Sequence, residues 1–162
     1  MNIITLDQHD IAEIKSISEN RMRNDMRYGA NYTLYYDVMN LPGRFEHECD
    51  SFGAEWAYCK MVGVMPDTNW KHYMPYDAIV NGHRVDVKWT KNINGCLQAK
   101  VGKDWIVKPE YFALLVGRLP VYLFCGYMRA DDLLRPGRID ASTRQRTAVY
   151  SARQDELYQE MY

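Results

Sequence analysis

Residues 74–92 read MPYDAIVNGHRVDVKWTKN, and this stretch decides the fold because it predicts a β-hairpin. Asn81 and Gly82 form the predicted turn, since both central positions of a type I′ turn need positive φ, which Asn and Gly tolerate best. A two-residue turn also fixes the register of the two strands. In that register Asp77 is expected to lie directly opposite Asp86.

Charged side chains share one face of this hairpin. Facing residues have Cβ atoms about 5 Å apart, so two aspartates repel each other unless a cation compensates. Lys88 is expected on the same face as Asp86, because side chains alternate along a strand. Two acids and a lysine suit a Mg²⁺ ion held beside a phosphate and a water. The opposite face is apolar, as expected of a strand pair packed on a core, and carries Tyr76, Ala78, Val80, Val85, Val87 and Trp89.

The same charged face has two other interpretations. It is also compatible with an ordinary solvated surface, although such a surface would more naturally set Asp opposite Lys than Asp opposite Asp. The hairpin would then belong to an unrelated α+β protein, with any helix carboxylate far from it. Coordinates separate these interpretations through the distance between the carboxylates.

The composition predicts a single domain spanning residues 1–162 that acts in the cytoplasm. The chain has 47% hydrophobic residues and a formal net charge of −1, so no global basic field favours nucleic acid. Any phosphate-binding surface must be local, and we single out Arg84, Lys91, Lys100, Arg144 and Arg146. They belong to a wider set of basic candidates near the N-terminus, after the hairpin and near the end of the chain: Arg21, Arg23, Arg27, Lys88, Lys103, Arg135, Arg138 and Arg153. No apolar run approaches the roughly 20 residues of a membrane span, and the N-terminus lacks signal-peptide features.

The rest of the chain predicts helices around a buried sheet. We expect a helix over residues 5–26 that starts at a Thr5-x-x-Gln8 capping box, an irregular segment over 29–44, and a helix over 49–64. Strands are predicted at 96–101, 111–116 and 121–127, a short helix at 131–134, and a strand and a polar helix in the tail from 148. The predicted class is α/β (α+β), with a mixed central sheet flanked by helices and residues 1–45 as an N-terminal extension.

These residues resemble the active-site pattern of the PD-(D/E)xK nuclease superfamily, whose members share a restriction-endonuclease-like fold. In that family a helix supplies a glutamate, the next strand an aspartate, and the following strand an acid-x-lysine. The matching positions are Glu55, Asp77, Asp86 and Lys88. The resemblance extends over residues 53–157 and is strongest to small phage-type nuclease domains. One departure is Tyr76, which separates the proline from the strand aspartate.

The resemblance implies a metal-dependent endonuclease or exonuclease that hydrolyses DNA. Asp77, Asp86 and the backbone carbonyl of Val87 would bind Mg²⁺, and Mn²⁺ would substitute for it. Glu55 would bind the metal or orient one of its waters, and Lys88 would stabilise the charge on the scissile phosphate.

Three further points follow from the same resemblance. Gln98 is expected beside the site as an accessory polar residue. Many members of the family dimerise, so a homodimer is one possible assembly of this protein. The alternative function is a catalytically inactive nuclease-like domain that binds nucleic acid or a protein, for example a phage factor that engages a host protein.

Overall fold

The computed structural model describes residues 2–28, 41–69, 74–141 and 148–161. The helices are α1 (Gln8–Tyr28), α3 (Leu41–Val62) and α4 (Ala130–Leu133), with 3-10 turns η1 (Pro136–Arg138) and η2 (Gln154–Glu156). The strands are β1 (Asn2–Thr5), β2 (Ala78–Val80), β3 (His83–Thr90), β4 (Leu97–Lys100), β5 (Tyr111–Arg118), β6 (Val121–Arg129), β7 (Ile139–Asp140) and β8 (Val149–Ala152). Among the described residues, no helix combines the length and the apolar character that a membrane crossing requires.

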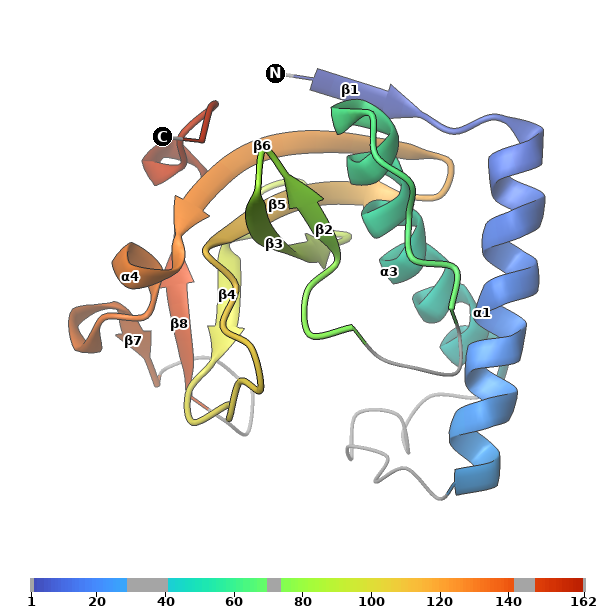
Figure 1. Cartoon of the computed structure of the whole chain (residues 1–162), viewed down its shortest axis with the longest axis horizontal. Coiled ribbons are helices and arrows are strands. Elements are labelled where there is room, and N and C mark those ends of the chain that lie inside the picture. The colour runs from blue at the N-terminus through green and yellow to red at the C-terminus, as the bar shows by residue number, and fades with distance from the viewer. Residues whose placement is uncertain (1, 29–40, 70–73, 142–147, 162) are drawn as a thin grey trace.

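The strands form two sheets. The larger has the order β1-β6-β5-β3-β2, in which β3 and β5 are parallel and the other neighbours antiparallel. The smaller has the order β4-β8-β7. Figure 1 shows the large sheet strongly curled, with α1 and α3 on one side and the small sheet on the other. The predicted α+β class, a mixed sheet flanked by helices, is therefore confirmed.

Strand β5 is buried on both faces, which explains its unbroken apolar sequence. Tyr111, Ala113 and Leu115 belong to the core on the helix side, together with residues of α1 and α3. Phe112, Leu114 and Val116 belong to the core on the side of the small sheet. The predicted buried strands at 111–116 and 121–127 are thus confirmed, and β5 separates two apolar cores.

The N-terminal helix starts later than predicted. Residues 2–5 pair with β6 as an edge strand, which the sequence analysis missed. Asp7 caps α1, because its Oδ1 accepts the backbone N–H groups of His9 and Asp10, both at 2.9 Å. The predicted Thr5 capping box was wrong, since Thr5 lies in the strand and Asp7 satisfies the exposed N–H groups of the first turn.

Helix α3 starts earlier than predicted. Leu41-Pro42-Gly43 was interpreted as a stop, but it forms the first turn of the helix. Proline is tolerated there because the first N–H groups of a helix have no acceptor within the helix. Residues 29–40, predicted to be irregular, lie outside the described residues.

The tail contains a strand but no α-helix within the described residues. Strand β8 confirms the predicted strand, whereas the predicted polar helix is replaced by the short η2 turn. Tyr158 then exchanges two backbone hydrogen bonds with Tyr127 of β6, at 2.7 and 2.8 Å. These bonds hold the chain end extended, so helical hydrogen bonds cannot form there. The short predicted helix at 131–134 is confirmed as α4, one residue earlier.

Candidate functional site

The Asn81-Gly82 turn sets the register of the hairpin as predicted. Its two residues have φ values of 52° and 83°. Strand β2 pairs with β3 in the predicted register, with Ala78 opposite Val85. The two strands therefore present Ala78, Val80, Val85 and Val87 to the core on the helix side, as the sequence indicates.

The ladder ends at Ala78, so the predicted direct pairing of Asp77 with Asp86 was wrong. The Asp77 N–H donates to the Val85 carbonyl at 2.9 Å, and the Asp77 Oδ2 accepts the Val87 N–H at 2.6 Å. The chain bends over residues 75–77, which draws Asp77 out of the ladder. Its carboxylate thus replaces a β2 residue as the hydrogen-bond partner of the Val87 N–H. The two aspartates remain close enough to interact electrostatically.

The Asp77 carboxylate lies in an unfavourable electrostatic environment. Burial and the neighbouring Asp86 raise its pKa from 3.8 to about 6, against the opposing effects of Lys88 and the Val87 N–H. A carboxyl group shifted in this way binds its proton more tightly in the folded protein. A cation bound beside Asp77 would remove much of this unfavourable energy.

Asp86 and Lys88 lie on β3 and face the small sheet. Asp86 is only 6% exposed, and in β3 it lies opposite Phe112 of β5. Its Oδ2 forms an ion pair with the Lys88 ammonium. That oxygen is buried and, within the described part of the chain, accepts no geometrically sound hydrogen bond. Asp86 is therefore a buried carboxylate whose charge is balanced by Lys88.

Glu55 comes from the middle of α3 and meets this group from the helix side. Burial and the Asp77 carboxylate raise its pKa well above the ordinary value, with a smaller effect from Asp86. Arg21 of α1 opposes the shift through an ion pair with Glu55 at 3.6 Å. The structure therefore brings together the three predicted carboxylates and Lys88, from two strands and a helix.

The three carboxylates do not form a ready-made set of metal ligands. Among the described residues, no group of three or more His, Cys, Asp or Glu side chains is arranged to hold a metal ion. The reason is visible in their partners: Arg21 lies against Glu55, Lys88 against Asp86, and the Val87 N–H against Asp77. The chemistry of the donors nevertheless fits Mg²⁺, which prefers hard carboxylate oxygens.

Arg21 was predicted only as a member of a basic cluster, and the structure places it beside Glu55. Its guanidinium also lies 3.8 Å from Glu48, stacks 3.9 Å above the Phe52 ring and donates to the Asp67 carbonyl at 3.3 Å. The sequence showed only a basic cluster near the end of the first helix. The contact with Glu55 depends on how α1 crosses α3, which spacing along one helix does not reveal.

Trp105 was missed, whereas Lys103 was predicted only as one of several basic residues that could bind phosphate. They lie in the loop between β4 and β5, where the Lys103 ammonium is 3.8 Å from the centre of the Trp105 ring. Lys88 approaches the same ring at 5.9 Å. Burial of the Lys103 ammonium, then repulsion from Lys88, lowers the pKa of Lys103, while Asp86 and Asp77 oppose that shift. This loop therefore adds a second lysine beside the acidic group.

The other predicted residues lie elsewhere or outside the description. Arg84 donates to the Lys108 carbonyl at 3.2 Å and pairs with Glu110 at 3.4 Å, at the far end of the hairpin. Lys91 and Lys100 are exposed. Gln98 lies in β4 of the small sheet, and its neighbours Leu97 and Ala99 point into the core. Arg144 and Arg146 fall outside the described residues, and the roles of Gln98 and the Val87 carbonyl stay predictions.

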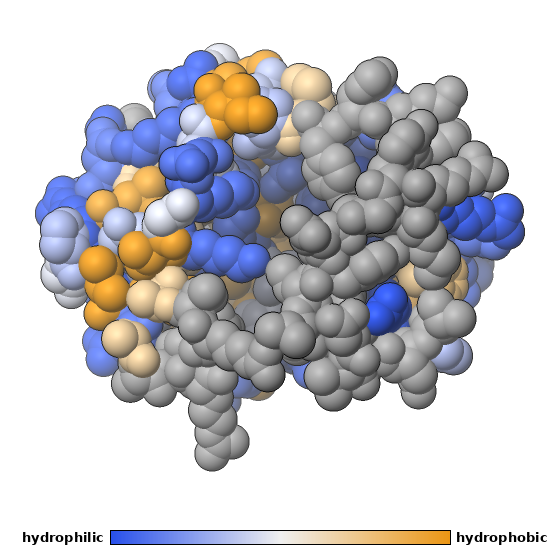
Figure 2. All heavy atoms as spheres, turned by 90° about the horizontal axis from the view of Figure 1, so that it is seen from below, coloured by the Kyte–Doolittle hydropathy of each residue, from blue (hydrophilic) through white to orange (hydrophobic). Residues whose placement is uncertain are grey.

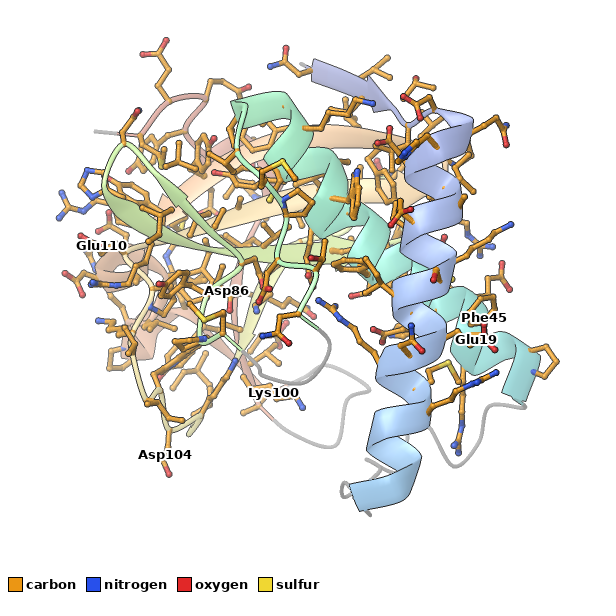
Figure 3. The ribbon with its side chains drawn as sticks, turned by 45° about the vertical axis from the view of Figure 1, so that its right-hand side comes forward. Glu19, Phe45, Asp86, Lys100, Asp104 and Glu110 are labelled. Carbon is orange, nitrogen blue, oxygen red and sulfur yellow. The ribbon has the colours of Figure 1, made fainter. Side chains whose placement is uncertain are left out.

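The surroundings of Asp86 can be followed in a view with side chains drawn as sticks. Figure 3 shows Asp86 in the middle of the view, beside α3, with Lys100 below it and Asp104 at the lower tip of a loop. Glu110 lies at the outer edge of the same view. Figure 2 shows hydrophilic and hydrophobic residues intermixed on the described part of the underside.

Comparisons with protein-family models, curated proteins and solved structures found no match to this chain.

Proposed function

We propose that this protein is a metal-dependent phosphodiesterase, and more specifically a Mg²⁺-dependent nuclease that hydrolyses DNA in the cell interior. The observation that carries the proposal is the convergence of Glu55, Asp77 and Asp86 next to Lys88. Two of these carboxyl groups, Glu55 and Asp77, have raised pKa values, first because they are buried and then because another carboxylate lies near, and the cations Arg21 and Lys88 only partly oppose the shifts.

Each residue has a role that its contacts support. Asp77 and Asp86 offer carboxylate oxygens for the ion, although the buried Oδ2 of Asp86 is paired with Lys88 and would have to share or exchange that ammonium. Mg²⁺, when bound, supplies positive charge at the phosphate and makes a water more acidic. Lys88 can turn from Asp86 to a phosphate oxygen and stabilise its growing negative charge. Glu55 is held toward the site by Arg21 and helps to orient water.

We further propose that the five-stranded sheet is a PD-(D/E)xK core. The order of a helix glutamate, a strand-end aspartate and an Asp-x-Lys strand supports this. So does the position of β3 in the sheet, between the edge strand β2 and the parallel strand β5. DNA is the partner in this proposal, and a homodimer stays a prediction.

Cleavage of supercoiled plasmid with Mg²⁺ or Mn²⁺ tests the activity. Wild type is expected to nick or linearise the plasmid only when the metal is present. Asp86→Asn and Lys88→Met should slow cleavage by roughly 10²- to 10³-fold, the usual effect of removing one preorganised charge. Glu19→Gln removes an exposed acid that pairs with Arg23 on α1 and should cleave normally. Metal-dependent cleavage that survives in both site variants would refute the proposed roles.

One observation favours a second candidate, a binding module without catalysis. Glu55 and Asp86 each lie against a cation of the chain itself, which is a stable arrangement for a site that holds no metal. A module of this kind would bind DNA or a protein without cutting, and metal would not stabilise it through Asp77. Measuring binding and cleavage on the same DNA separates the two candidates.

A further inference from the structure

The loop between β4 and β5 places a second ammonium group beside the candidate site. Lys103 and Lys88 come from different elements, yet both ammonium groups lie against the ring of Trp105, at 3.8 and 5.9 Å from its centre. Trp105 is itself fixed by an edge-to-face contact with Phe112 of β5, at 5.7 Å between the ring centres. The ring is thus a rigid support for two cations.

The two lysines differ in their partners. Lys88 is paired with Asp86. Lys103 is exposed as a whole residue, although its ammonium is partly covered, and among the described residues no carboxylate lies within ion-pair distance of it. Its ammonium lies against the Trp105 ring, while Asp86 and Asp77 favour its charge only from longer range. Like charges held together are unfavourable unless an anion lies between them. A free ammonium beside a paired one is therefore suited to a ligand that brings its own negative charge.

We propose that Lys103, supported by Trp105, binds a phosphate of the DNA strand and positions that strand against Lys88 and the carboxylates. This inference rests on the proposed function, because it names the part of the substrate that this loop would hold. Lys103 would bind the backbone without reading sequence, since phosphate contacts carry no base information. It is a substrate-positioning residue, and Lys88 remains the residue assigned to the reacting phosphate.

Lys108 offers a matched control on the same loop. It is also exposed, but its ammonium pairs with Asp131 of α4 at 2.7 Å and not with a carboxylate of the candidate site. Lys103→Ala and Lys108→Ala therefore remove the same charge from the chain. Lys103→Arg keeps a cation able to stack on the ring. Because Lys103 and Lys108 are both exposed, these variants should fold like wild type.

The test combines binding of a short fluorescein-labelled DNA duplex, without divalent metal and over a range of salt concentrations, with steady-state cleavage in Mg²⁺. Lys103→Ala should weaken binding about tenfold, reduce the slope of log K against log salt by about one, and raise KM with kcat nearly unchanged. Lys103→Arg should restore most of the binding. Lys108→Ala should match wild type in affinity and KM.

The outcomes separate this inference from the proposed function. Wild type that cleaves DNA, with Lys103→Ala equal to it in affinity, salt slope and KM, overturns the inference alone. Equal losses in Lys103→Ala and Lys108→Ala also overturn it, because they would show only a general charge effect. DNA binding that depends on Lys103 without any cleavage supports the inference and overturns the proposed nuclease. Neither binding nor cleavage by wild type overturns both.

Discussion

At the scale of single residues, Asp77 links the fold to the candidate chemistry. Its carboxylate accepts the Val87 N–H at the open edge of β3, so it is part of the framework. Burial and Asp86 nevertheless raise its pKa to about 6. Keeping Asp77 ionised therefore destabilises the folded protein, and a bound cation would reduce that unfavourable energy.

The first prediction concerns stability without metal. Because the folded pKa of Asp77 lies above the ordinary 3.8, the associated stability is present at low pH and is lost as pH rises through about 6. Asp77→Asn keeps an acceptor for the Val87 N–H but removes the charge. At pH 8 it should be more stable than wild type, by at most about 3 kcal/mol. Urea denaturation in EDTA at pH 5 and pH 8 measures the difference.

Its control is Glu19→Gln, which removes an exposed acid of α1. That variant should show no comparable gain at either pH. An Asp77→Asn protein that is less stable than wild type at pH 8, with an unchanged fold, would contradict the electrostatic account of this residue.

At the scale of elements, α1 and α3 are joined by a buried polar contact. Asp10 accepts the Trp56 Nε1–H at 3.0 Å and forms an ion pair with Lys60, which also binds Asp7 at 3.1 Å. Burial alone would raise the pKa of Asp10, but Lys60, the Asp7 N–H and Trp56 together lower it. The contact fixes α3 against α1, and with it the position of Glu55.

The second prediction follows from this contact. Asp10→Ala should destabilise the protein by about 2 kcal/mol at pH 7, because Trp56 and Lys60 lose a shared partner. A lowered folded pKa contributes stability above the ordinary value of about 3.8 and loses it as pH falls through the folded pKa. The gap between wild type and variant should therefore shrink in acid, measured by urea denaturation at pH 7 and pH 3. A constant gap, or an equal loss in the exposed Asp155→Ala, would contradict this.

The third prediction tests the turn that sets the hairpin register. Gly82 has φ of +83°, a conformation that a side chain makes unfavourable although there is open space around it. Gly82→Ala should destabilise the protein by about 1 kcal/mol. Gly137→Ala, which also has open space but no positive φ, is the matched control and should be near neutral. Equal thermal midpoints for the two variants would show that the turn is not strained.

The hairpin and the buried strands could be predicted because their signals are local. Asn81-Gly82 specifies a turn, and the apolar run from Tyr111 specifies a strand buried on both faces. The start of α3 could not be predicted, because Leu41-Pro42-Gly43 is equally typical of a helix end. Strand β1 was missed because four residues show no periodicity, and its pairing with β6 is a long-range contact.

The same limit applies to the candidate site. Glu55, Asp77, Asp86 and Lys88 could be selected from residue type, spacing and family resemblance. Arg21 and Lys103 were predicted only as members of basic clusters. Their contacts at the site could not be predicted, because these depend on the crossing of two helices and on the path of a loop. The exact partner of Asp77 was also beyond the sequence, since the bend over residues 75–77 removes it from the ladder.

At the scale of the whole molecule, the site draws its residues from both sides of the large sheet. Asp86 and Lys88 project from β3 toward the small sheet, Glu55 comes from α3 on the helix side, and Asp77 lies at the end of the edge strand between them. Because β2 begins only at Ala78, the Asp77 carboxylate rather than a strand residue accepts the Val87 N–H. Burial by both layers then makes the carboxylates sensitive to any cation that enters.

Thermal unfolding with increasing Mn²⁺ tests the central claim, that these carboxylates form a metal site. The account predicts a rising midpoint for wild type, equivalent to about 2.7 kcal/mol at a metal concentration a hundred times the Kd. The rise should vanish in Asp77→Asn and shrink in Glu55→Gln, whereas Glu19→Gln should behave as wild type. No rise in wild type, or an equal rise in all four proteins, would contradict the claim.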